Sequence, residues 1–208
     1  YNFFCALNFA LGCIFFLGYY GIIDDLIVLF FGAGLEVEKS ISFVITVNYF
    51  IQFMRQATLL FKDASGTFYY DRWKPIFEGL SNLVLSILFV LFFQKVFNDD
   101  LAVVGVIVAT IITNLTICHI VEPHVLHKYA FQTSAKKYYL RNYLYMISFV
   151  IVLVVLNFCM VHFDNKLVEL LVNGCIAVGL SIVPIFCLIV RDKDFRYYAK
   201  SVLKRKRQ

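Results

Sequence analysis

The sequence predicts an all-α integral membrane protein, a polytopic bundle of about six transmembrane helices. Its 208 residues are 61% hydrophobic and 16% charged, with a mean hydropathy of +0.78, whereas soluble domains carry roughly 45–50% apolar and about 25% charged residues. The apolar residues gather in runs of about twenty, the length that crosses a hydrocarbon core of ~30 Å. The strict alternation of β-barrel strands is absent from the sequence, so helices are the expected spanning elements.

Six stretches have the length and composition of a membrane span. Four contain no Asp, Glu, Lys or Arg, while the second contains Arg55 and the third Glu78. The predicted spans are 3–23, 41–61, 76–93, 101–120, 143–161 and 170–190. They form one transmembrane domain over 1–190, followed by a basic amphipathic cytoplasmic tail at 191–208.

Local signals mark several helix ends. Pro75 stands at a helix-opening position, and the pair 98–99 (Asn-Asp) can cap the fourth span. Pro184 lies inside the sixth span and predicts a kink, which membrane helices tolerate. The apolar stretch 26–35 is too short to cross, so it is either a short helix at the outer interface or the top of a bent first span.

The positions of Lys and Arg predict the orientation, because cytoplasmic loops retain these residues. The loops 62–75 and 121–142 hold three and four of them, and the tail 191–208 holds eight. The alternate loops have one each and are otherwise acidic. Both ends of the chain are therefore expected in the cytoplasm.

The tail and the beginning of the chain carry two further expectations. Apolar residues recur at helical spacing between basic ones in 191–208, which predicts a helix on the anionic lipids of the inner leaflet; a solvated tail is the alternative. The chain begins at Tyr1 with no basic segment or cleavage site. We expect a piece of a longer protein.

The second span carries a polar stripe at i, i+4, i+7/i+8 spacing, on an otherwise apolar helix. An arginine near the centre of a span costs roughly 2.5–3.5 kcal/mol to insert. Arg55 is therefore expected to face a cavity, to pair with Glu78 or to extend to the headgroups. The stripe consists of Asn48, Gln52, Arg55 and Gln56.

The next two spans also carry polar faces. Glu78, Asn82 and Ser86 follow strict i, i+4, i+8 spacing in the third, and Thr110, Thr113 and Asn114 cluster in the fourth. Each set alone is typical of helix–helix hydrogen bonding, but three neighbouring polar helices indicate a shared aqueous cavity. The expected substrate-binding residues are Asn48, Gln52, Arg55, Gln56, Glu78, Asn82, Thr110 and Asn114.

Other polar residues predict no further chemistry. His119, Glu122 and His124 end the fourth span and are expected to be solvated at the interface. The six cysteines fall in apolar runs without a metal-ligand or disulfide pattern, so they are expected to pack in helices. We expect no metal, no cofactor and no nucleic-acid partner.

Several motifs together are similar to those of a known family. The run from Gly66 through Pro75, then Glu78 and the stretch 82–86, resembles the bacterial polysaccharide-transport flippases of the MOP exporter superfamily, which move O-antigen and capsular repeat units. The stretches 26–32, 48–49, 105–110 and 122–129 fit the same pattern. The resemblance covers roughly residues 20–130.

The resemblance implies a MOP/MATE-like fold, two helical bundles in a V with alternating access, of which this chain would be the C-terminal six helices. It implies a location in the bacterial cytoplasmic membrane and a missing N-terminal bundle as partner. The implied function is to move undecaprenyl-diphosphate-linked oligosaccharides to the outer leaflet for surface polysaccharide synthesis, without catalytic residues. In relatives, cavity cations engage the diphosphate, and Arg55 is the matching position.

Three alternatives stay open. A multidrug cation exporter of the same superfamily would favour an acidic, aromatic cavity. A glycosyl polymerase or ligase would need catalytic groups on a large outer loop, and only His162 lies near one. The chain could also be a truncated remnant that does not transport.

Overall fold

The computed structural model describes residues 1–32, 34–35, 37–96, 101–189 and 196–197. Within these ranges every regular element is helical and no strand occurs, which confirms the all-α prediction. The helices divide into two compact units, unit 1 with residues 1–36 and 141–208 and unit 2 with residues 37–140.

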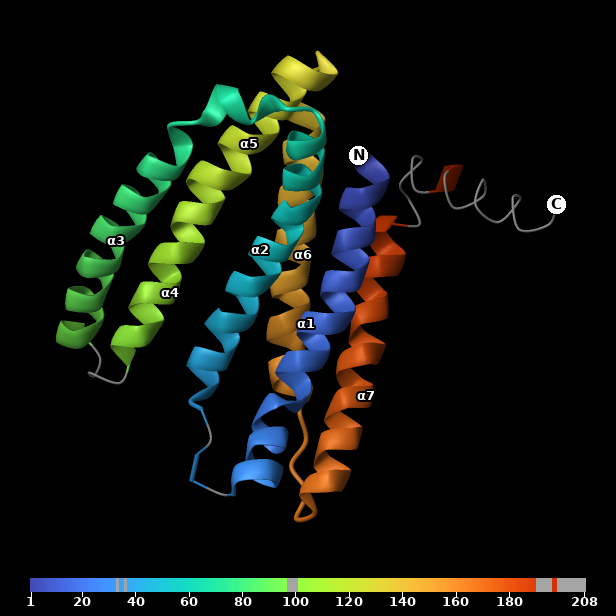
Figure 1. Cartoon of the computed structure of the whole chain (residues 1–208). Helices are drawn as coiled ribbons and strands as arrows, with labels where there is room; N and C mark the ends of the chain where they lie inside the picture. Colours follow the sequence, from blue (N-terminus) through green and yellow to red (C-terminus); the bar gives the residue numbers. More distant parts are fainter. Residues whose placement is uncertain (33, 36, 97–100, 190–195, 198–208) are drawn as a thin grey trace. The chain divides into compact units, whose positions relative to one another are not determined.

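Unit 1 is built from long helices. In Figure 1, α1 and α7 lie side by side and run in opposite directions. A Cβ added at Gly21 would lie 2.8 Å from Ala177 Cβ, so the missing side chain is what lets the two backbones approach. The helices of unit 1 are α1 (Asn2–Phe31), most of α6 (Lys136–Cys159), α7 (Lys166–Pro184) and the π-helical turn η5 (Ile185–Ile189).

Helices α1 and α6 run parallel to each other. The rings of Phe9 and Tyr145 stack with centroids 4.3 Å apart. Further along both helices, the Tyr20 hydroxyl donates to Asn157 Oδ1 at 2.6 Å. The two contacts keep nearly the same offset in residue number, 136 and 137, which requires the same chain direction in both helices.

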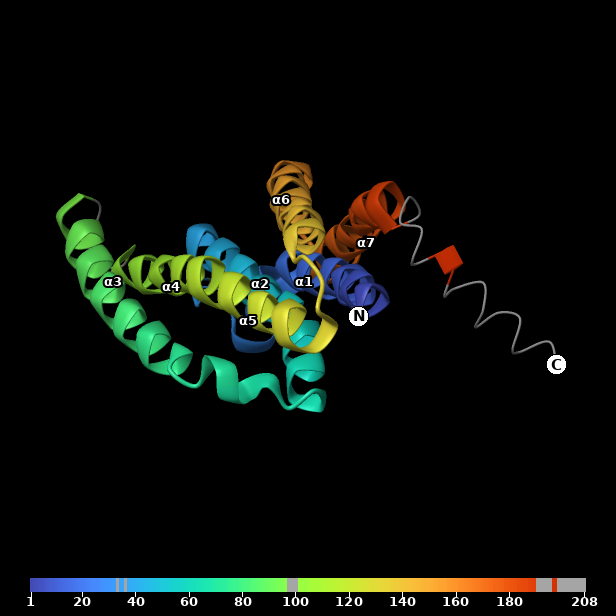
Figure 2. The same ribbon diagram turned by 90° about the horizontal axis from the view of Figure 1, so that it is seen from above.

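Unit 2 has α4 at its centre, between α2 and α3 (Figure 2). A Cβ at Gly105 in α4 would lie 2.9 Å from the backbone of Phe89 in α3, so these helices also meet through a small residue. The helices of unit 2 are α2 (Lys39–Ala64), η1 (Thr67–Asp71), α3 (Lys74–Val96), α4 (Ala102–Thr113), η3 (Asn114–Cys118), α5 (His119–Val125) and η4 (Leu126–Phe131).

Five of the described helices are long and apolar enough to cross a membrane: α1, α3, the continuous helix 102–131, α6, and α7 with its extension to Cys187. Five of the six predicted spans are thus helices of the expected kind. The remaining stretch, 41–61, lies in α2, which has 26 residues. Its amides and Arg55 make α2 less apolar than the others, and its membrane crossing stays a prediction.

The helix ends differ from the predictions at several points. The stretch 26–31 continues α1 without interruption. The prediction of a separate helix at the outer interface is therefore wrong. Pro75 is the second residue of α3, as predicted. The regular α-helix of α7 ends at Pro184 and gives way to a π-helical turn. The expected cap at 98–99 and nearly all of the tail, 191–195 and 198–208, lie outside the described residues.

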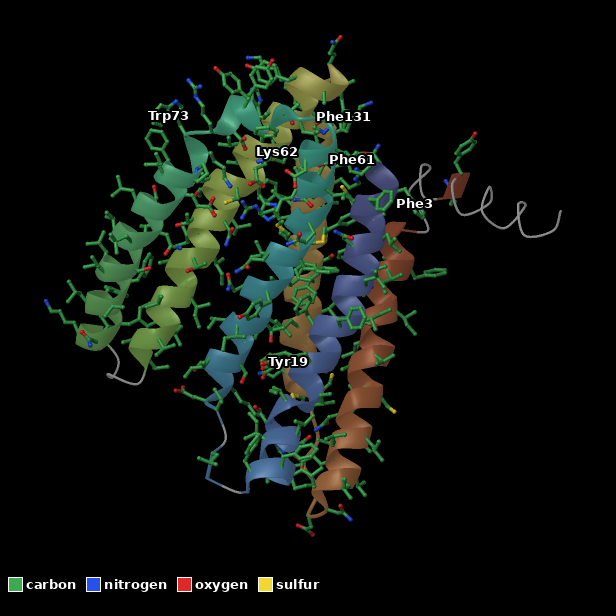
Figure 3. The ribbon with its side chains drawn as sticks, viewed as in Figure 1. Phe3, Tyr19, Phe61, Lys62, Trp73 and Phe131 are labelled. Atoms are coloured by element: carbon green, nitrogen blue, oxygen red, sulfur yellow. The ribbon has the colours of Figure 1, made fainter. Side chains whose placement is uncertain are left out.

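Aromatic side chains surround the connection between α2 and α3. Tyr69, Tyr70 and Trp73 are all more than half exposed, and Figure 3 shows Trp73 at the start of α3, directed outward. Exposed aromatic rings at a helix end are typical of the membrane–water interface. The connection therefore has the composition of an interfacial segment.

Candidate functional site

Arg55 of α2 forms a two-point ion pair with Glu122 of α5. The Nε atom donates to Oε2 at 2.7 Å, and Nη2 donates to Oε1 at 2.5 Å. The Glu122 side chain is 1% exposed and that of Arg55 is 19% exposed. This fork geometry is the strongest pairing available to a guanidinium, and it holds Arg55 toward the interior of unit 2.

Two residues of α3 complete a cluster of four charges. Lys74 Nζ lies 2.5 Å from Glu122 Oε1 and 2.7 Å from Glu78 Oε2. Glu78 Oε1 lies 3.5 Å from Arg55 Nη1, the longest of these contacts. We call Arg55, Lys74, Glu78 and Glu122 the charge cluster; its formal charges sum to zero.

The helix geometry explains why these four side chains meet. Lys74 and Glu78 are four residues apart on α3 and therefore share one face. Helices α2 and α5 run parallel, with His119 bound to the Ile51 carbonyl at 3.0 Å one turn before the Arg55–Glu122 pair. The two contacts have offsets of 68 and 67 residues, so the register of α2 against α5 brings Arg55 to Glu122.

The predicted polar face of α3 lines an open groove of about 440 Å³. Glu78, Asn82 and Ser86 lie along it, together with Pro75, Gly79 and Leu83. Asn82 Nδ2 donates to Thr110 Oγ1 of α4 at 3.1 Å, and the Ser86 hydroxyl donates to Asn82 Oδ1 at 3.3 Å. Glu78, 28% exposed, belongs to both the groove and the charge cluster.

The structure brings only part of the predicted site together. Arg55 and Glu78 meet, as do Asn82 and Thr110, whereas no hydrogen bond within the described residues joins the other amides of the α2 stripe to this group. Asn48 is buried, and its Oδ1 has no hydrogen-bond partner among the described residues. Gln52 is half-buried, Gln56 is exposed and Asn114 is buried.

Two residues of the charge cluster were not predicted as site residues. Glu122 was expected to be solvated, but it is fully buried, and His119 is 1% exposed; both expectations were wrong. His124 is exposed, as expected. Lys74 falls within the predicted loop 62–75 but is the first residue of α3, with its side chain 5% exposed. The i, i+4 spacing of Lys74 and Glu78 was the available signal, whereas nothing in the sequence pairs Glu122 with Arg55.

A second buried ion pair closes the connection between α2 and α3. Lys62 Nζ lies 2.7 Å from Asp71 Oδ2, and both side chains are at most 10% exposed. Thr67 and Ser65 bind the Lys62 carbonyl, at 3.3 and 3.1 Å. Figure 3 shows Lys62 at the end of unit 2 that also carries Phe61 and Phe131, whose ring centroids are 6.2 Å apart. This pair lies outside the groove lining.

Unit 1 has its own polar cluster, at the junction of α6 and α7. Glu169, with its side chain 2% exposed, binds Lys166 at 2.9 Å and His162 at 2.8 Å. Asn173 donates to Asp25 Oδ2 of α1 at 3.3 Å. These contacts fasten the end of α1 to the start of α7, which is a structural role.

The fold and the charge cluster define a polytopic α-helical membrane protein with buried charges beside a polar groove. No protein-family model, curated protein or solved structure matches the chain.

Proposed function

We propose that the chain is part of a flippase that translocates undecaprenyl-diphosphate-linked oligosaccharides across the bacterial cytoplasmic membrane. The motifs of residues 20–130 motivate the family, and the contact of two cations with the groove residue Glu78 supports the mechanism. In this proposal the six helices form the C-terminal bundle of a MOP-type transporter, and an N-terminal bundle completes the pathway. Transport breaks no covalent bond, so the proposal includes no catalytic residue.

The proposal requires α2 to cross the membrane as a sixth span. The parallel direction of α1 and α6 supports this, because an odd number of crossings must separate two parallel spans. Helices α3 and α4 supply two crossings, so α2 supplies the third. Pairing with Glu122 also lowers the cost of placing Arg55 in the membrane.

The observation that carries the proposal is the position of Glu78. Its carboxylate lies between the groove and the two cations, 2.7 Å from Lys74 and 3.5 Å from Arg55. A diphosphate entering the groove can replace the Glu78 carboxylate on both cations, since phosphate oxygens and carboxylates bind the same donors. Glu122 keeps the cations in place during this exchange, and the polar face of α3 supplies hydrogen bonds for sugar hydroxyls.

Such a site reduces the main barrier to flipping, the removal of a charged, hydrated headgroup from water. Alternating access would then expose the occupied groove to the outer face. A multidrug cation exporter is less favoured, because the groove-lining carboxylate of the cluster, Glu78, is already neutralised by Arg55 and Lys74.

The test is surface polysaccharide export by the full-length protein in a bacterial strain that lacks its own flippase. The double variant Arg55→Gln with Glu122→Gln removes the ion pair but leaves hydrogen-bonding side chains, so the fold is retained. The matched control is Lys62→Gln with Asp71→Asn, which removes the buried pair outside the groove. Protein levels are compared by immunoblotting.

We expect the Arg55/Glu122 double variant to lose export at normal protein levels, while the control double variant keeps it. Undiminished export by the Arg55/Glu122 variant would remove Arg55 from the mechanism. Equal loss in both double variants would assign a structural role to both pairs. Drug resistance conferred by the wild-type protein without polysaccharide export would favour the exporter alternative.

A further inference from the structure

A pocket separate from the groove lies where η4 ends and α6 begins. Its volume is about 690 Å³, within the range of roughly 300–1,000 Å³ typical of ligand sites. Its lining residues all fall between 124 and 139, and none of them belongs to the charge cluster. The pocket is therefore a second candidate site in unit 2.

The pocket is cationic. Lys128, Lys136, His124 and His127 line it, and its lining contains no carboxylate. The sequence contains no Asp or Glu between residues 123 and 163, and Glu122, the acid that directly precedes this stretch in the sequence, is bound to Arg55 and Lys74. Within the described residues neither lining lysine forms an ion pair. The positive charge of the pocket is therefore not neutralised locally.

The walls of the pocket are held by hydrogen bonds. His127 Nδ1 lies 3.1 Å from Thr133 Oγ1, and the Thr133 amide donates to the His127 carbonyl at 3.0 Å. Gln132 adopts a left-handed conformation, with φ 51°, to make the turn. The Tyr139 hydroxyl donates to the Ile120 carbonyl at 2.7 Å, which fixes the first turn of α6 against α5.

The start of α6 adds to the positive potential. Ser134, Lys136 and Tyr139 of this segment line the pocket, and α6 has 24 residues. The amino end of a helix carries partial positive charge, which favours anions. Hydroxyl groups of Thr133 and Ser134 beside two lysines match the oxygens of a phosphate group.

We propose that this pocket binds a phosphate group, carried either by an anionic lipid headgroup or by a soluble phosphate compound. The two sources share the same chemistry, since both present oxygens with negative charge to lysines, hydroxyls and a helix terminus. The site does not depend on the flippase proposal, because it uses none of the groove residues.

The test measures binding of two probes to the full-length protein in nanodiscs of phosphatidylcholine. The probes are dihexanoyl phosphatidic acid and inorganic phosphate, titrated by microscale thermophoresis. The pocket variant is Lys128→Gln with Lys136→Gln. The matched control is Lys95→Gln with Lys137→Gln, which removes the same charge from exposed lysines outside the pocket. Circular dichroism checks that both variants are folded.

We expect the pocket variant to weaken phosphate binding about 25-fold, since each of the two lysines contributes about fivefold, and the control variant to bind like the wild type. Binding of phosphatidic acid alone supports a lipid headgroup as ligand, and binding of inorganic phosphate supports a soluble compound. Equal weakening in both variants, or no binding of either probe by the wild type, overturns the proposal.

Discussion

Arg55 and Glu122 are joined by two hydrogen bonds, of 2.7 and 2.5 Å, between α2 and α5. The carboxylate also binds Lys74 at 2.5 Å, so one buried acid holds two cations. Removing one partner of a buried ion pair is far more costly than removing an exposed charge, because it leaves the other charge buried without compensation. The charge cluster is thus a stability element as well as a candidate site.

Glu122→Ala should destabilise the protein by about 3–5 kcal/mol, since Arg55 and Lys74 both lose their buried partner. The measurement is unfolding in detergent, followed by circular dichroism. Glu38→Ala is the control, because Glu38 is exposed and its side chain caps nothing. If the two variants unfold alike, the ion pair does not stabilise unit 2.

Asp71→Asn should loosen the connection between α2 and α3. The substitution leaves the Lys62 ammonium buried without a counter-charge, at a cost of about 3 kcal/mol. Hydrogen exchange of amides 65–73 should accelerate by roughly 100-fold, because local opening becomes easier. Asp63→Asn, at an exposed position in the last turn of α2, should leave exchange unchanged; acceleration in both variants would contradict the role of the pair.

Gly21→Ala should destabilise unit 1 by about 1–3 kcal/mol, because the added methyl group would lie 2.8 Å from Ala177 Cβ and force α1 and α7 apart. Gly18→Ala is a control on the same helix, since nothing lies within 4 Å of its added Cβ. Thermal unfolding in detergent compares the two. If the Gly21 variant is as stable as the Gly18 variant or more stable, α1 and α7 can accommodate the added methyl group without loss of stability.

If α2 crosses the membrane, its two ends lie on opposite sides and are accessible to reagents from opposite sides. In a variant without native cysteines, Glu38→Cys should react with a membrane-impermeant maleimide in intact cells, and Ser65→Cys only after permeabilisation. Both positions are exposed, so burial does not limit labelling. Labelling of both positions from the same side would exclude α2 as a span.

Most of the helices were predictable from the sequence. A membrane span requires about twenty apolar residues, and the runs of that length in this chain are easily told apart from the segments between them. The polar face of α3 was predictable as well, since i, i+4 spacing alone places Glu78, Asn82 and Ser86 on one side. The continuation of the fourth helix to Phe131 was missed, because Pro123 and the charged residues around it indicated an interfacial loop.

The pairing of Arg55 with Glu78 was predicted, but its closer partner, Glu122, could not be. The choice of Glu122 depends on the register of α2 against α5, which packing in three dimensions determines and sequence spacing does not. The same limit applies to Lys74. Its position in a basic loop segment predicted which side of the membrane the loop faces, but not that the Lys74 side chain is buried. Of the three expectations for Arg55, the pair with Glu78 is confirmed, and the structure adds Glu122 and Lys74 to it.

The most direct test of the proposed function is flipping by the full-length protein in liposomes. A fluorescent undecaprenyl-diphosphate oligosaccharide is placed in the membrane, and dithionite quenching reports how much reaches the outer leaflet. The wild type and the Lys62→Gln/Asp71→Asn control should flip the lipid at least about tenfold faster than protein-free liposomes, and Arg55→Gln/Glu122→Gln should not. Flipping by the Arg55/Glu122 variant at the wild-type rate, or none by the wild type, would contradict the proposal.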